Sequence, residues 1–236
     1  ALTARGQVFV FPVKKSRPLQ ITRDASVRFR DARFLDNQSL VALSDQSGEL
    51  EYWELPISQS AAPRRITRDG KVFRYAPLPS PDGKQIAHVD KDYNLWISAR
   101  KLGGSVKIAN STHNNFYDLC WSPDSQFLAY VVGAENWNDQ IRVYSLKNRS
   151  TIELTTDRAD SYSPAWSADG SWLYFLSDRN LVSLVGSPWG PRQPEPFFDK
   201  TTRIYELALV KDLRSPFRTP DELVAETAED EEQKEK

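Results

Sequence analysis

The chain has little of the chemistry that most structural metal sites and disulfides need. Among 236 residues there is one cysteine, Cys120, so no disulfide can form within the chain. The two histidines, His88 and His113, have no cysteine cluster near them, which argues against a zinc site. No run of about 18 apolar residues and no signal-peptide pattern is present. We therefore expect no cofactor, no metal and no membrane partner.

Methionine is absent altogether, including at residue 1, which is unusual for this length and suggests a segment of a longer protein. The net charge of −1 is unevenly distributed, because residues 221–236 contain eight acidic and two basic residues. We interpret 221–236 as an acidic linker or disordered tail. Residues 1–220 carry no basic stripe and no nucleic-acid-binding motif, so we expect no nucleic acid partner.

One unit occurs four times and organises the chain. It consists of a strand that ends in an aromatic residue, a turn built on aspartate, and a second, apolar strand, which is a β-hairpin signature. Its clearest copy is 162–176, and the others are 117–130, 76–88 and the degenerate 32–41. The turn aspartates are Asp36, Asp82, Asp124 and Asp169, separated by 46, 42 and 45 residues. A period of roughly 40 to 45 residues with several short strands is typical of a β-propeller.

The turn chemistry explains why aspartate recurs. Pro81 and Pro123 preset the backbone for a tight turn, aspartate can accept a hydrogen bond from its own backbone, and Gly83 and Gly170 tolerate positive φ. We therefore interpret the repeated aspartates as turn residues and not as catalytic residues.

The sequence predicts an all-β fold: a β-propeller with four-stranded antiparallel blades, of which about four to five are present, in one domain over 1–220. Two strands at 6–13 and 19–22 lack a preceding hairpin and look like the outer half of an interrupted blade. The third strands are expected at 50–55, 93–98 and 140–146, the outermost strands near 64–67, 106–109 and 151–155, and the last strand at 204–210. Residues 187–198 contain four prolines and should form an ordered loop.

Catalytic and metal-binding motifs are missing. The stretch 90–94 resembles the first half of a calcium loop, but Leu95 replaces the required glycine and Lys101 replaces the bidentate glutamate. No Gly-x-Ser-x-Gly elbow is present, and a serine nucleophile would need one of the two histidines as its base. We identify no catalytic and no metal-binding residue.

The repeats at 121–125 and 165–170 resemble TolB-type propeller repeats. The segments 161–166, 175–181, 187–196 and 213–217 together resemble bacterial homologues of tricorn protease. In that family two N-terminal propellers precede a catalytic region with a PDZ domain, and the second propeller is seven-bladed. The place of 214–217 implies the C-terminal part of that second propeller, although four hairpins and a leading half blade fall short of seven.

The resemblance implies a non-catalytic segment of a serine peptidase that acts as a channel or filter for oligopeptides. The family's catalytic residues lie in later domains, so none is carried over to this chain. Expected partners are oligopeptides and the other domains of a homo-oligomeric peptidase, in the cytoplasm, or in the periplasm if the whole protein has a leader. The alternatives are a TolB-like protein-binding module without a peptidase, and a propeller hydrolase with its own site.

A peptide would meet the loops that enter the innermost strands, because these loops surround one mouth of a propeller channel. They are expected at 28–30, 74–75, 114–117 and 160–162. Arginine and amide groups beside aromatic rings can hold peptide carbonyls and carboxylates. The alternative is that these are ordinary solvated loop residues. The candidate peptide-binding residues are Arg30, Arg74, Tyr75, Asn115, Tyr117 and Tyr162.

Overall fold

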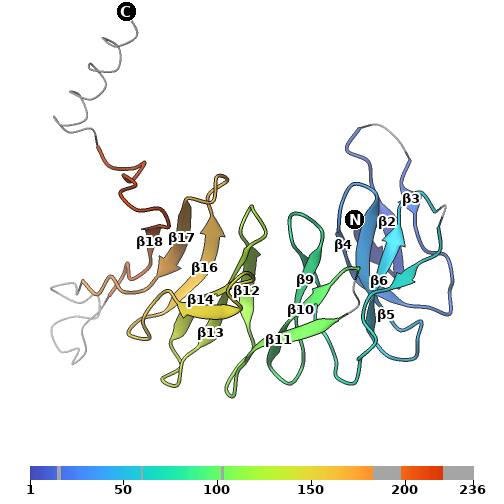
Figure 1. Cartoon of the computed structure of the whole chain (residues 1–236), viewed down its shortest axis with the longest axis horizontal. Coiled ribbons are helices and arrows are strands. Elements are labelled where there is room, and N and C mark those ends of the chain that lie inside the picture. Colours follow the sequence, from blue (N-terminus) through green and yellow to red (C-terminus); the bar gives the residue numbers. More distant parts are fainter. Residues whose placement is uncertain (15–16, 60, 102–103, 183–197, 220–236) are drawn as a thin grey trace, which may run out of the picture.

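The computed structural model describes residues 1–14, 17–59, 61–101, 104–182 and 198–219. These residues form strands, turns and loops without any helix, in five antiparallel sheets. The sheets follow one another in sequence order along an open arc, with the β1–β3 sheet at one end and the β16–β18 sheet at the other (Figure 1). The predicted all-β propeller class is confirmed.

The three middle sheets are the complete blades, each a four-stranded meander in which sequence neighbours pair. Within each blade the first strand is innermost and the fourth outermost, as the sequence predicts. Their strands are β4 (Phe29–Phe34), β5 (Ser39–Ser44), β6 (Glu51–Pro56) and β7 (Arg64–Arg65); β8 (Leu78–Pro79), β9 (Gln85–Val89), β10 (Asn94–Ala99) and β11 (Ser105–Asn110); β12 (Tyr117–Trp121), β13 (Phe127–Gly133), β14 (Asp139–Ser145) and β15 (Ser150–Glu153).

The two end sheets have three strands each in the described part of the chain. They are β1 (Leu2–Ala4), β2 (Gln7–Val10) and β3 (Leu19–Gln20), and β16 (Ser161–Trp166), β17 (Trp172–Ser177) and β18 (Arg203–Ala208). The prediction for the first sheet was incomplete, because it held only two strands and missed β1. The predicted loop at 187–198 lies almost wholly outside the described residues, as does the tail at 221–236.

A recurrent hydrogen bond shows which strand the first sheet lacks. In three blades a threonine just after the outermost strand accepts a hydrogen bond from a backbone N–H of the third strand. The pairs are Val8–Thr22, Tyr52–Thr67 and Ile141–Thr155, at 2.9, 3.0 and 3.0 Å. By this equivalence β2 is a third strand, β1 is a second strand, and the innermost strand of that blade is absent from the described residues.

The repeated turns have the predicted conformation. The carboxylate of each turn aspartate accepts a hydrogen bond from a backbone N–H two residues later and from a nearby serine hydroxyl. Gly83 and Gly170 have φ of 66° and 73°, and Ser125 takes the same conformation at 61°. The aspartates are therefore structural, as expected.

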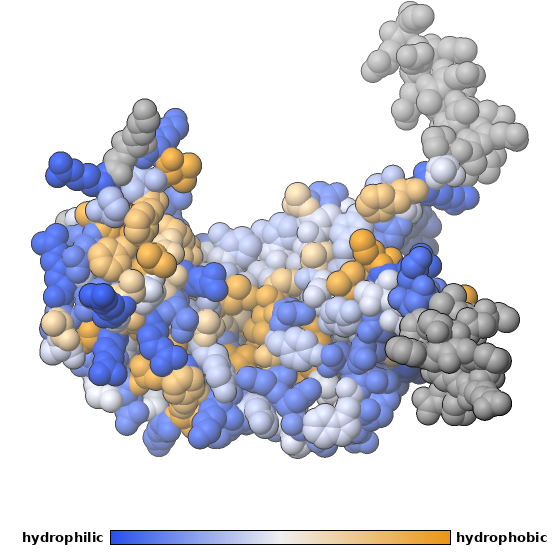
Figure 2. All heavy atoms as spheres, turned by 180° about the vertical axis from the view of Figure 1, so that it is seen from behind, coloured by the Kyte–Doolittle hydropathy of each residue, from blue (hydrophilic) through white to orange (hydrophobic). Residues whose placement is uncertain are grey.

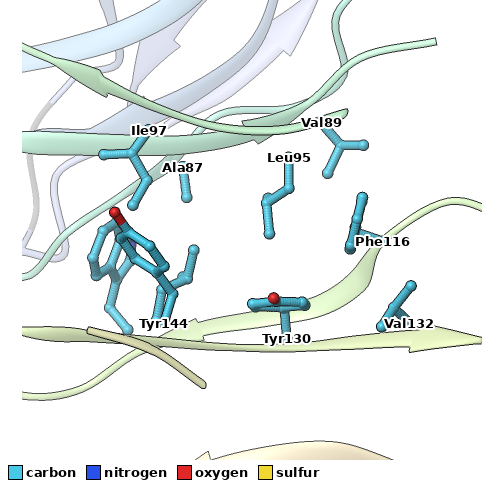
Figure 3. Packing of buried hydrophobic residues seen from close by; sticks show 10 residues of the cluster. Ala87, Val89, Leu95, Ile97, Phe116, Tyr130, Val132 and Tyr144 are labelled. Carbon is cyan, nitrogen blue, oxygen red and sulfur yellow. The ribbon is translucent and has the colours of Figure 1, made fainter. Parts of the chain in front are cut away.

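The core is a series of apolar layers between successive blades. In Figure 3, Ala87, Val89, Leu95 and Ile97 of the β8–β11 blade face Phe116, Tyr130, Val132 and Tyr144 of the next blade. Each large side chain buried in such a layer contributes about 1.5–3 kcal/mol. Two indoles add polar links between innermost strands: Trp121 Nε1 donates to Leu78 O at 3.0 Å, and Trp166 Nε1 donates to Cys120 O at 3.3 Å.

Candidate functional site

Four of the predicted peptide-binding residues occupy one structurally equivalent position. Each lies on or just before the innermost strand of its blade, opposite the residue seven places after the turn aspartate. The pairs are Arg30–Leu43, Tyr75–Val89, Tyr117–Val131 and Tyr162–Leu176. Four consecutive blades thus contribute one side chain each at the entry to their innermost strands.

A β-bulge follows this position in three of the four blades. Asp31, Asp118 and Ser163 adopt φ of 53°, 47° and 52°, and the strand register shifts at the same place. Bulges change the direction of side chains and often lie beside functional sites. Here the Asp118 carboxylate accepts hydrogen bonds from Ser163 N at 2.9 Å and Ser163 Oγ at 3.1 Å, which ties neighbouring innermost strands together.

Arg30 and Tyr75 are joined by a residue that the sequence analysis missed. The guanidinium carbon of Arg30 lies 5.4 Å from the centre of the Phe73 ring. The Phe73 and Tyr75 rings meet edge to face at 5.5 Å, and these residues are 38% and 40% exposed. The spacing of Phe73 and Tyr75 about Arg74 was the available signal, since alternate residues of an extended segment share one side. This cluster offers a cation and two accessible rings to an extended chain.

Arg74 points into the protein instead. Only 5% of the residue is exposed, and its guanidinium lies 2.7 Å from Glu51 Oε2 and 2.6 Å from Asp69 Oδ1. It also lies 5.8 Å from the Tyr52 ring. Contact between Arg74 and a peptide stays a prediction, but these buried ion pairs give the side chain a structural role.

The other three predicted residues are half-buried. Burial, and then a hydrogen bond to Asp139, raises the pKa of Tyr117, so its hydroxyl remains protonated. The Tyr162 hydroxyl donates to Asp178 Oδ1 at 3.3 Å. Asn115 Oδ1 accepts from the backbone N–H of Phe116 at 3.0 Å. These side chains are therefore held in place by their own blades.

No accessible pair of nucleophile and base is found in the described region. His88 is 2% exposed and Ser98 is 1% exposed, and His88 Nε2 lies 2.9 Å from Ser98 Oγ, so this contact is out of reach of a substrate. Burial, and then the charge of Arg74, lowers the pKa of His88 to about 3, so the ring is neutral. Burial raises the pKa of the Cys120 thiol to about 12. The described ranges contain no cluster of three or more metal-binding side chains.

The calcium-like stretch is also satisfied internally. The Asp90 carboxylate accepts hydrogen bonds from the backbone of Asp92, from Asn94 and from Trp96 Nε1. Within the same described ranges, no helix has the length and apolar character to span a bilayer.

Comparisons with known proteins give the same picture. The family described as the tricorn protease second β-propeller domain matches residues 1–236. A tricorn protease homologue of Saccharolobus solfataricus is 22% identical over 181 residues, which is 77% of this chain and 16% of the relative. Tricorn protease homolog 1 of Streptomyces coelicolor is 27% identical over 160 residues, which is 67% of this chain and 13% of the relative. The similarity thus extends to archaeal as well as bacterial relatives, and the chain spans less than a fifth of the length of both.

Solved structures agree on the fold. The crystal structure of tricorn protease superimposes with a TM-score of 0.75 at 21% identity, covering 91% of this chain and 21% of that one. TolB of Acinetobacter baumannii superimposes with a TM-score of 0.54 at 16% identity, covering 72% and 42% of the two chains. The chain therefore belongs to the family of the second β-propeller domain of tricorn protease.

Proposed function

We propose that this chain is a non-catalytic propeller segment of a tricorn-like serine peptidase and forms part of a channel or filter for oligopeptides. The observation that carries the proposal is the row of Arg30, Tyr75, Tyr117 and Tyr162 at equivalent positions on four blades. A peptide that enters the channel at this end of the innermost strands would pass within reach of these side chains.

The strand edges support the same use. The innermost strands β4, β8, β12 and β16 pair on one side only, so the backbone groups along their other edge have no strand partner among the described residues. Backbone groups of this kind bind extended peptides with little choice of sequence, while neighbouring pockets select side chains. A filter for many different oligopeptides needs backbone contacts that accept any sequence together with pockets that select side chains.

The proposal extends to the whole protein. The peptidase chemistry would come from other domains, in a homo-oligomer located in the cytoplasm or, with a leader, in the periplasm. The seven-bladed ring of the family would place this arc as the C-terminal part of the second propeller.

The test measures turnover and binding on the same purified chain. We expect no cleavage of fluorogenic peptides, because the histidine–serine contact in the described residues, His88 with Ser98, is buried away from any substrate. We expect an unlabelled hexapeptide mixture to shift backbone NMR signals of β4 and β8 in a saturable way. The double variant Arg30→Ala, Tyr75→Ala should weaken this binding about fivefold or more.

Arg23→Ala is the matched control, since Arg23 is exposed and lies outside the innermost strands. Saturable shifts confined to the outermost strands, or equal binding by the double variant and the control, would eliminate the mouth as the contact. Turnover that disappears in the His88→Ala, His113→Ala variant would instead support the propeller-hydrolase alternative.

A further inference from the structure

A recess lies at the opposite end of the innermost strands from the predicted mouth. It is shallow and widely open to solvent, with a volume of about 540 Å³. Three successive blades contribute to it, through the ends of β4, β8 and β12. Figure 2 shows apolar side chains at the surface in the middle of the arc, between the two raised ends. We call this recess the three-blade hollow; its lining includes Arg33, Phe34, Leu78, Pro79, Leu119 and Trp121.

Arg33 is the charged side chain of the three-blade hollow that has no charged partner among the described residues. Asp36 also lines it, but Arg100 Nη1 lies 2.7 Å from Asp36 Oδ2, and Arg100 Nη2 lies 2.6 Å from Glu54 Oε1. Although burial raises the pKa of Asp36, the hydrogen bonds from Arg100 and the backbone lower it to about 2, so this carboxylate is ionised and already paired. The Arg33 side chain is exposed and makes no ion pair or hydrogen bond within the described ranges.

The rest of the lining is largely apolar and firmly held. Leu78, Pro79 and Leu119 are only partly buried and supply this apolar surface. Phe34 pairs with Leu40, which packs against the preceding blade, so its side chain lies on the other face of β4 from Arg33. Trp121 is 8% exposed, and its indole is fixed by the hydrogen bond to Leu78 O across the blade boundary. The ligand that fits has an apolar side chain beside an anionic group.

We propose that the three-blade hollow binds the C-terminal residue of an oligopeptide, with its carboxylate on Arg33 and an apolar side chain against Leu78 and Pro79. A C-terminal residue carries both groups on the same α carbon, whereas an internal aspartate or glutamate gives up the apolar side chain to supply the charge. Arginine is well suited to this because it binds carboxylates in a two-pronged, charge-assisted manner. This proposal rests on the proposed peptide-binding function and adds which part of the oligopeptide is recognised, namely its C-terminal residue.

The geometry also sets a peptide length. Arg30 at the mouth and Arg33 at the hollow lie three residues apart on the same strand, β4, on either side of its bulge. Three residues of strand span about 10 Å at most, so an extended peptide of roughly three or more residues would reach both sites. Shorter peptides would reach only one of them.

The experiment compares acetyl-Ala-Ala-Ala-Leu with a free carboxylate and the same peptide with a C-terminal amide, titrated against the whole chain by NMR. We expect the free acid to bind more tightly, and Arg33→Gln to weaken it about fivefold while leaving the amide unchanged. Arg33→Lys should recover part of the loss, and higher salt should reduce the difference between the two peptides. Arg23→Gln is the control for loss of an exposed arginine elsewhere.

Failure of this proposal can be told apart from failure of the proposed function. If the peptides bind and Arg30→Ala weakens them while Arg33→Gln does not, the hollow is overturned and the mouth stands. If the affinity of an amidated peptide with an internal aspartate depends on Arg33 as strongly as that of the free acid does, the claim that the bound carboxylate is the C-terminal one is overturned. If neither peptide shifts any innermost-strand signal, both proposals are overturned.

Discussion

At the residue scale, the arginines near the innermost strands differ in whether a carboxylate already binds them. Arg74 and Arg100 pair with acidic residues of the preceding blade, Glu51 and Glu54. These partners lie 23 and 46 residues away, which is why the sequence did not separate Arg74 from Arg30. Whether a charged side chain is buried depends on contacts between repeats. The repeat pattern in the sequence predicts only the contacts within one repeat.

Replacement of Arg74 tests its structural role. Arg74→Ala leaves Glu51, whose side chain is 1% exposed, as a buried carboxylate without its closest cation. Because Arg65 still pairs with Glu51 at 2.9 Å, we expect the free energy of unfolding to fall by about 3 kcal/mol, the lower end of the cost of breaking a buried ion pair, measured by urea denaturation. Lys84→Ala is the control, because Lys84 is 78% exposed in its pair with Asp82 and should cost less than about 1 kcal/mol. Equal midpoints for both variants would show that Arg74 is not a structural residue.

At the element scale, the hairpins were predictable because their determinants are local. Aspartate, proline and glycine lie within four residues of one another in the clearest turns, so the sequence alone specifies the turn and the two strands beside it. The short strands were harder. β1 and β8 contain three and two residues, too few for an alternating pattern to show.

Two turn glycines should differ in their tolerance of a side chain. At Gly170 an added Cβ would meet nothing closer than Pro123 at 3.8 Å, so Gly170→Ala carries only the strain of positive φ, about 1 kcal/mol. At Gly83 the same atom would lie 2.3 Å from Leu35 O of the preceding blade. Gly83→Ala should therefore cost about 2 kcal/mol more in urea denaturation. Equal losses for the two variants would mean that the blades do not approach each other at Gly83.

At the scale of the whole molecule, the arc ends on a face that resembles the interior of the other blades. Ile204 occupies the same position in the last blade that Tyr52 occupies in its own blade. Ile204 pairs with Leu176 and Tyr52 pairs with Leu43, and each of these leucines lies seven residues after its turn aspartate. Tyr52 is fully buried by the next blade, whereas Ile204 is 76% exposed. One carboxylate oxygen of Glu206 on the same strand is buried without a partner in the described residues. These are the features expected where a further blade would pack in the seven-bladed ring that the family resemblance implies.

The propeller class and the equivalence of Arg30, Tyr75, Tyr117 and Tyr162 were accessible from sequence because both repeat with the blade, while their role as a peptide-binding mouth stays a prediction. The three-blade hollow was not, because it combines side chains of three blades. Only the folded arrangement places Arg33 beside Leu78 and Trp121 and pairs Asp36 with Arg100.

The central claim is that oligopeptides run along the innermost strands of the arc. We would attach a nitroxide to the amino terminus of a free-acid hexapeptide and measure the broadening of backbone amide signals across the chain. The account predicts strong broadening near Arg30, Tyr75 and Tyr117 and little at the outermost strands β7, β11 and β15. Uniform broadening, or broadening strongest at those outermost strands, would contradict it.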